Sequence, residues 1–240
     1  MSNFQILNSI DHKDLRVIDQ AGAEYGDAIH CCPAYTFEFR SLQTDFPLLF
    51  TDTTTDGLLP IALMGFEPGE NLLLDGASWR ASSRPAFLRK GPFLIGQHTT
   101  NEAEDVRLLS IDMEHARVST HDEGELLFQP LGGRTAYLES IADLLEHIHF
   151  AAEETKQFVA ALKALDLIES VTLDISLRDG SQNQLLGFST VNEEAVKTLS
   201  PSALGELSKA GQLMPLFMML ASLGNLRKLI DLKEAAKVAP

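Results

Sequence analysis

The sequence predicts an α+β protein, with mostly antiparallel short strands in the N-terminal half and helices plus one β-hairpin in the C-terminal half. In positions 1–130, short apolar runs alternate with turn residues, which is typical of an antiparallel sheet. In positions 131–240, apolar residues recur at helical spacing, except for a hairpin at 171–189. A chain of 240 residues can form one large domain or two small ones, and we expect both regions to form one integrated domain.

The strand-rich region 1–130 contains two predicted hairpins. Positions 47–50 form an apolar run, and Asp52–Gly57 after it is rich in residues that bond their own backbone. The apolar run at 58–66 completes the first hairpin. Positions 118–120 and 125–129 flank a polar turn and predict the second. Further strands are expected at 71–74, 87–96 and 106–112.

The C-terminal region changes to a helical period. Apolar side chains between Thr135 and about Leu167 predict one long amphipathic helix, or two with a break near Ala151. Val171–Leu177 alternates apolar and polar residues, and Gln184–Ser189 follows an Asp-Gly turn, which predicts a hairpin. Further helices are expected to open at the capping-box residue Thr190, at Ser200–Pro201 and at Met214, the last running to Leu232.

The chain is acidic, with 34 aspartates and glutamates against 19 lysines and arginines and a formal net charge of -15. A surface of this sign repels nucleic-acid phosphates and anionic lipid headgroups. The densest basic group, Arg84, Arg89 and Lys90, is too small to form a basic stripe. The sequence therefore argues against nucleic-acid binding.

Three features predict a cytoplasmic protein without a membrane span. The two cysteines, Cys31 and Cys32, are adjacent and poorly placed to bridge each other, which suits a reducing compartment. Charged residues at 11–14 stand where a signal peptide needs an apolar core. The longest apolar run, Leu213–Leu223, is shorter than the ~20 residues that a membrane helix needs.

Asp112, Glu114 and His115 belong to the densest run of candidate metal ligands. On a strand, Asp112 and Glu114 share one face, so both carboxylates can reach one cation. The spacing matches no zinc or calcium motif, and the alternative is a solvated hairpin on an acidic protein. The three residues define a candidate metal site and the hypothesis of a metal-assisted enzyme subunit.

Trp79, the only tryptophan, directly precedes Arg80, and Arg89 follows ten residues later. An aromatic ring near arginines can form a pocket for an anion or a peptide. Under this hypothesis Trp79, Arg80 and Arg89 bind a small ligand such as a sugar or an amino acid. The alternative is that Trp79 caps the end of a sheet.

The segment 213–220 is apolar nearly all round. Such a helix is typical of a protein core. The functional alternative is a methionine-rich surface that adapts to a partner, because methionine side chains are flexible and polarisable. The candidate partner surface consists of Met214, Phe217, Met218 and Met219.

Five motifs occur in a fixed order along the chain. They are 46–50 (FPLLF), 60–75 (PIALMGFEPGENLLLD), 89–93 (RKGPF), 125–128 (ELLF) and 213–223 (LMPLFMMLASL). Together they resemble bacterial SapC-like proteins over most of the chain, from about Phe46 onward. The resemblance implies an accessory role, since relatives are often encoded beside TonB-dependent receptors, cupin-like oxygenases and flavin-dependent halogenase-like proteins. It carries no catalytic residue over to this chain.

The sequence contains no nucleophile elbow, P-loop or dinucleotide-binding glycine pattern, so it favours a protein that is not an enzyme, and we expect no cofactor. The leading hypothesis is a non-enzymatic bacterial accessory protein that binds a protein or peptide partner, in connection with TonB-dependent uptake or protein modification. A homo-oligomer is left open. The alternatives are the metal-assisted enzyme subunit and the small-ligand sensor.

Overall fold

The computed structural model describes residues 3–53, 57–99, 105–176 and 182–238. The chain forms two compact units: unit 1 comprises residues 1–27, 76–78 and 86–150, and unit 2 comprises residues 28–75, 79–85 and 151–240. Both contain antiparallel sheets and helices, which confirms the α+β class. The expected integration into one domain stays a prediction.

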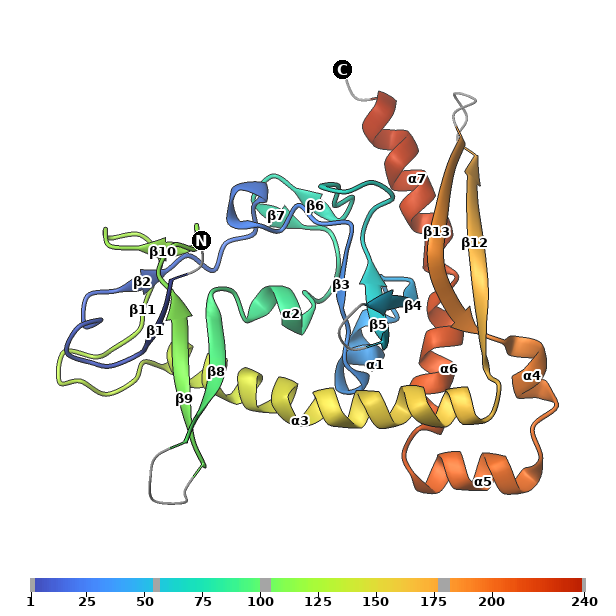
Figure 1. The fold of residues 1–240 in the computed structure, drawn as a ribbon. Helices are drawn as coiled ribbons and strands as arrows, with labels where there is room; N and C mark the ends of the chain where they lie inside the picture. The colour runs from blue at the N-terminus through green and yellow to red at the C-terminus, as the bar shows by residue number, and fades with distance from the viewer. Residues whose placement is uncertain (1–2, 54–56, 100–104, 177–181, 239–240) are drawn as a thin grey trace. The chain divides into compact units, whose positions relative to one another are not determined.

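Unit 1 contains two small sheets (Figure 1). The first has the order β1-β9-β8, and the second has the order β10-β2-β11. The bounds are β1 (Phe4–Ile6), β2 (Arg16–Val17), η1 (Ala23–Tyr25), α2 (Ala86–Arg89), β8 (Phe93–Thr99), β9 (Asp105–Asp112), β10 (Val118–Ser119) and β11 (Glu125–Leu126). Helix α3 (Ala136–Ala164) begins in unit 1 and passes into unit 2 at residue 151.

The core of unit 1 lies between the first sheet and the start of α3. Phe93 and Ile111 come from the sheet, and Leu138 and Ile141 come from the helix. Leu127, which precedes the helix, is also fully buried in this cluster. The burial of these side chains stabilises the sheet against α3, since apolar burial is the main favourable term in folding.

The second predicted hairpin is wrong. Strands β10 and β11 do not pair with each other, because both pair with β2, and Val17 lies opposite both Val118 and Glu125. The connecting loop approaches β2 closely at Gly124, which has φ 93°, and a Cβ at this position would lie 2.6 Å from the Val17 carbonyl oxygen. Arg16 also donates to the Gly124 carbonyl at 2.9 Å. A distant strand therefore separates the two arms.

The predicted strand at 87–96 is correct only in its second part. Residues 86–89 form the helical turn α2, directly after Pro85, and β8 begins at Phe93. Gly91, with φ 52°, makes the turn between them. Of the predicted strand 71–74, only Leu74 lies in a strand, namely β6 (Leu74–Asp75), which pairs with β7 (Ser78–Trp79).

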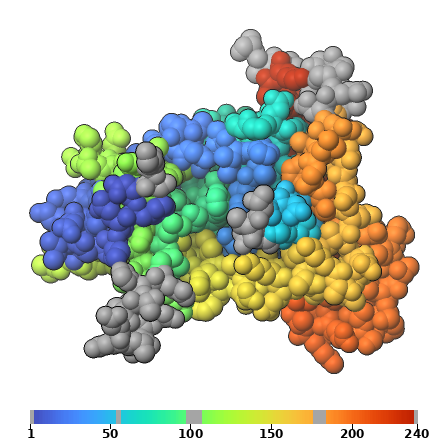
Figure 2. Space-filling model, in the orientation of Figure 1, coloured from blue at the N-terminus to red at the C-terminus, as the bar shows by residue number. Residues whose placement is uncertain are grey.

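Unit 2 is built on a five-stranded antiparallel sheet of order β12-β13-β4-β5-β3. The strand bounds are β3 (Cys31–Pro33), β4 (Leu48–Thr53), β5 (Gly57–Leu63), β12 (Ile168–Ser176) and β13 (Gln182–Val191). The first predicted hairpin is confirmed as β4–β5, and the hairpin at 171–189 is confirmed as β12–β13. The Asp-Gly turn of the second lies outside the described residues. Figure 2 shows the β12–β13 hairpin at the surface of the unit.

The helices of unit 2 follow the sequence pattern with two differences. Their bounds are η2 (Thr36–Glu38), α1 (Phe39–Leu42), α4 (Glu193–Lys197), α5 (Pro201–Lys209), α6 (Leu213–Ser222) and α7 (Asn225–Val238). Helix α3 is continuous through Ala151, and Ser200 caps α5 as expected. Helix α4 is capped by Asn192 instead of Thr190, which lies in β13. The expected final helix is divided into α6 and α7 at Leu223–Gly224.

Candidate functional site

Helix α6 has one buried row and one exposed row of apolar side chains. Leu216 and Met219 are 0% and 1% exposed, whereas Met214 and Phe217 are 56% and 47% exposed. Met218 is half-buried. The four residues of the predicted partner surface are therefore not all on one surface: Met219 belongs to the core, and Met214 and Phe217 form the accessible part.

The buried row fixes α6 on the sheet of unit 2. The Ser222 hydroxyl, fully buried, accepts the backbone N–H of Leu48 at 2.8 Å and donates to the Met219 carbonyl at 2.6 Å. The helix also contacts α1, β4 and β13, and Figure 1 shows it beside β13. The exposed row is consequently presented by a well-anchored helix.

The segment Leu213–Lys237 has 25 residues and is, by length and composition, apolar enough to cross a membrane. It is longer than the run expected from the sequence, because α7 follows α6 after a short break. Only 22% of its most apolar 18-residue stretch is buried. Core helices of soluble proteins pass the same test, so this is weak evidence, and the absence of a span stays a prediction.

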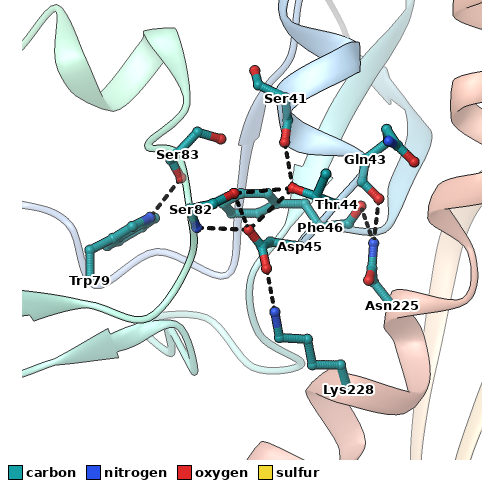
Figure 3. A network of polar contacts seen from close by, with 10 residues as sticks. All are labelled: Ser41, Gln43, Thr44, Asp45, Phe46, Trp79, Ser82, Ser83, Asn225 and Lys228. Atoms are coloured by element: carbon teal, nitrogen blue, oxygen red, sulfur yellow. Dashed lines mark hydrogen bonds and ion pairs between the residues drawn. The ribbon is translucent and has the colours of Figure 1, made fainter.

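Helix α7 is tied to the segment after α1 by polar contacts (Figure 3). The Asp45 carboxylate accepts the ammonium group of Lys228, the Ser82 backbone N–H at 2.7 Å and the Ser82 hydroxyl at 2.6 Å. Asn225 donates its side-chain amide to two backbone carbonyls of the same segment, at 2.8 and 3.3 Å. Three parts of unit 2 thus meet at one carboxylate.

The environment of Asp45 favours its charged form. Burial raises the pKa of its carboxyl, but hydrogen bonds from Lys228 and Ser82 outweigh burial and lower the pKa to about 2. The carboxylate therefore stays ionised and paired at neutral pH.

Trp79 and Arg80 each have a local polar partner in unit 2. The Trp79 indole N–H donates to the Ser83 carbonyl at 2.8 Å, which closes the loop in Figure 3. Arg80 forms an ion pair with Asp75 at 3.0 Å. Trp79 and Arg80 belong to unit 2 and Arg89 is an exposed residue of unit 1, so a ligand site formed by the three residues stays a prediction. The hydrogen bond to Ser83 satisfies the indole N–H, which is the only polar group of the Trp79 side chain.

Asp112, Glu114 and His115 do not form a metal site. In the described parts of the chain, no three histidine, cysteine, aspartate or glutamate side chains gather closely enough to hold an ion. One Asp112 oxygen accepts the backbone N–H groups of Asn3 at 2.8 Å and Glu114 at 3.2 Å. His115 accepts the Arg117 backbone N–H. Local turn bonding after β9 therefore occupies the Asp112 and His115 side chains.

An ion pair that the sequence did not indicate lies buried in unit 1. Arg117 and Asp27 have side chains 3% and 2% exposed, and one guanidinium nitrogen lies 2.8 Å from each carboxylate oxygen. The other terminal nitrogen donates to the carbonyls of Ile18 and Gln20 at 2.8 and 2.7 Å. The guanidinium also lies over the Tyr25 ring, 5.3 Å from its centroid. This pair holds the segment after β2 against the turn before β10.

Two basic groups near this pair are held in a partly desolvated environment. Burial lowers the pKa of Lys90, whose ammonium lies 5.1 Å from the centre of the Phe87 ring. Burial, followed by the charge of Arg117, lowers the pKa of His115. The His115 Nδ1 accepts the Arg117 N–H at 3.1 Å, so the proton of the neutral ring is on Nε2.

The sequence did not indicate that Arg117 and Asp27 form a pair or that Lys90 is partly buried, and the reason is physical. Asp27 and Arg117 are separated by 90 positions, and no local pattern connects them. In the sequence, Lys90 is recognisable only as a member of a small basic group. Its position next to Gly91 and Pro92, inside the motif RKGPF, was the one available signal that the chain turns sharply there.

Comparison with curated proteins and with solved structures finds no match. A family model, SapC, matches residues 7–229. The match includes all five motifs and almost all of both units. The chain belongs to the SapC family.

Proposed function

We propose that this protein is a non-enzymatic bacterial accessory protein that binds a protein partner through the exposed row of α6. The single observation that carries the proposal is the exposure of Met214 and Phe217 on a helix that is anchored by its buried residues Leu216, Met219 and Ser222. These residues are three positions apart and therefore on one face of α6. Exposed methionine and aromatic side chains are enriched at protein interfaces.

The chemistry of the thiols supports a role without covalent catalysis at Cys31 and Cys32. Burial raises the pKa of both thiols, so both stay protonated at neutral pH and are poor nucleophiles. Both are free cysteines. Free, protonated thiols also suit the cytoplasmic location that we include in the proposal.

The partner that fits this surface has an apolar helix face flanked by basic residues. A row at positions 214, 217 and, partly buried, 218 matches the spacing of apolar side chains on another helix. The net charge of -15 attracts a basic protein and repels an acidic one. The genomic context of the family makes a cupin-like oxygenase, a halogenase-like protein or a TonB-dependent receptor the first partners to test.

The test begins with site-specific cross-linking in the native host. A photoreactive phenylalanine analogue replaces Phe217 in one strain and Leu186, which is 65% exposed on β13 of the same unit, in a control strain. We expect an adduct with one other protein from position 217 and none from position 186. Equal adducts from both positions, or no adduct from 217, would contradict the proposal.

The second step measures the affinity of the purified cross-linked partner by calorimetry. The double variant Met214→Ser/Phe217→Ser should bind at least tenfold more weakly, and Leu186→Ser should bind like the wild type. Both variants change exposed side chains and should keep the wild-type melting temperature. An adduct with twice the mass of the chain itself would make α6 a self-association surface and would rule out a separate partner.

A further inference from the structure

The five-stranded sheet of unit 2 has two edges of different kinds. At one edge, β3 has three residues and ends on Pro33, which has no backbone N–H to donate. At the other edge, β12 has nine residues and contains no proline and no lysine (Figure 1). A short length, a proline or a lysine keeps a sheet edge from pairing with another chain. The β3 edge is therefore protected, whereas β12 lacks these three devices.

The outer side of β12 is open for strand pairing. Among the residues that the structure describes, β12 pairs only with β13, and its backbone takes part in no hydrogen bond to any other segment. An edge strand directs a row of N–H and C=O groups away from its one neighbour. Water or a further strand can satisfy this row.

The side chains of β12 alternate between the two faces of the sheet. Val171 and Leu173 are half-buried on one face. Ser170, Thr172 and Asp174 are exposed on the other face. A strand added to β12 would therefore cover apolar side chains on the first face and meet polar side chains on the second.

We propose that β12 is a homodimer interface, at which β12 of a second copy of this chain adds antiparallel and joins the two five-stranded sheets. The interface does not involve α6 and is independent of the proposed function. A two-fold axis perpendicular to the sheet pairs the same surface of both copies. The register that pairs all nine residues places Thr172 opposite Thr172 of the second copy.

This register is self-complementary. The directly opposite pairs within it are Glu169–Ile175, Ser170–Asp174, Val171–Leu173 and Thr172–Thr172. No two carboxylates lie opposite each other, which would destabilise the pairing. The Ser170 hydroxyl can donate to Asp174 of the second copy, because Gln184 donates to only one Asp174 oxygen, at 2.8 Å. Val171 and Leu173 lose exposed apolar surface, which favours association.

The alternative occupant of this edge is an extended segment of a different protein. To match the charges of β12, such a segment needs a basic residue opposite Glu169 on one face and another opposite Asp174 on the other face. The second copy meets both residues without a like charge and requires no separate partner. Salt dependence distinguishes the two, because each copy has a net charge of -15. Salt screens the repulsion between two copies but also screens the attraction of a basic segment.

The first test is sedimentation equilibrium of the full chain over a range of protein and NaCl concentrations. We expect a monomer–dimer equilibrium in which the dimer fraction rises with both. The variant Met214→Ser/Phe217→Ser, which changes only α6, should dimerise like the wild type. A chain that stays monomeric under all conditions, or a dimer that dissociates as salt is added, would overturn the proposal.

The second test is disulfide formation across the two-fold axis. Directly opposite residues of an antiparallel pair have Cα atoms about 4.5–5.5 Å apart, which is within the range of a disulfide. Thr172→Cys should therefore give a covalent dimer on mild oxidation. Ser170→Cys, which is exposed on the same face, should not, and the wild type controls for the free thiols of Cys31 and Cys32. Equal amounts of covalent dimer from the two variants would refute this register.

Two lysine variants separate the interface from a general effect of net charge. Thr172→Lys places two ammonium groups opposite each other and should weaken dimerisation at least tenfold. Ser170→Lys changes the net charge equally but places each ammonium opposite Asp174 of the other copy, so it should strengthen dimerisation. Both positions are exposed, so both variants should keep the wild-type melting temperature under monomeric conditions. If the two variants change the dimerisation constant alike, the dimer does not form at β12 and the proposal is wrong.

Discussion

The partly buried lysines of the two units differ in whether they pair with carboxylates. In unit 2, both lysines of α7 that approach buried structure find carboxylates: Lys228 pairs with Asp45, and Lys233 pairs with both glutamates of the turn 67–70. In unit 1, Lys90 lies in a partly desolvated position and pairs with no carboxylate among the described residues. The first arrangement holds elements together, and in the second the ammonium group lies over an aromatic ring.

Unit 1 also contains a complete, buried ion pair. Arg117 and Asp27 form the most buried ion pair that the structure describes, with side chains 3% and 2% exposed. The complete ion pairs therefore join segments of the chain, and Lys90, which pairs with no carboxylate among the described residues, lies at the wall of a cavity. This contrast implies that the paired residues contribute most of the electrostatic stability.

The largest expected effect is the loss of the buried pair in unit 1. Arg117→Met leaves the Asp27 carboxylate buried without its cation, and removal of one partner of such a pair costs about 3–5 kcal/mol. We expect urea denaturation, followed by circular dichroism, to show this loss. The double variant Arg117→Met/Asp27→Asn should recover part of it. A single variant as stable as the wild type would show that the pair does not hold unit 1 together.

The second effect concerns the attachment of α7 in unit 2. Lys233 is 9% exposed and its ammonium contacts Glu70, which is 19% exposed, and Glu67 at 2.9 Å. Lys233→Met removes the ammonium group from both contacts and should cost about 1–3 kcal/mol in the free energy of unfolding.

A matched control for Lys233 is Lys197, which also pairs with two glutamates, at 3.1 and 2.9 Å, but on an exposed helix. Lys197→Met should leave the stability unchanged, because solvent screens exposed ion pairs. Equal losses for the two variants, measured by urea denaturation, would mean that burial does not distinguish these ion pairs.

Local patterns in the sequence predicted local structure well. The alternation of Val171–Leu177 with Gln184–Ser189 predicted β12–β13, and the Ser-Pro pair at 200–201 predicted the start of α5, because each depends on neighbours in the chain. The pairing of β13 with β4 was not predictable in this way. It brings Phe188 opposite Thr51, and no local period encodes a contact across so many residues.

The lack of a local signal for distant contacts also explains why the surroundings of the candidate sites could not be predicted. Asp112 and His115 stand in a dense group of polar residues in the sequence, and in the fold backbone N–H groups bond to one Asp112 oxygen and to a ring nitrogen of His115. The cavity that they line depends on Lys90 and on the distant Tyr25–Asp27 segment. On α6, an apolar helix period could not separate Met214 from Met219, because the sheet beneath the helix determines which row is buried.

The smallest expected effect is the acid sensitivity of the contacts around Asp45. Its pKa lies at about 2 in the folded chain against 3.8 for the unperturbed group, so the folded state binds fewer protons between these values. Stability from this group is therefore complete above pH 3.8 and is lost as the pH falls towards 2. The shift alone corresponds to about 2.4 kcal/mol. Because the Lys228 side chain is 40% exposed, screening reduces this to about 1 kcal/mol.

Asp45→Asn isolates this contribution from the other carboxylates. The variant keeps a side-chain oxygen for Ser82 but has no charge for Lys228. The difference in unfolding free energy between wild type and variant, measured in urea from pH 5 to pH 2, should shrink as the pH falls. A difference that stays constant over this range would mean that the stability provided by Asp45 comes from its hydrogen-bond geometry, and that α7 is not held by charge.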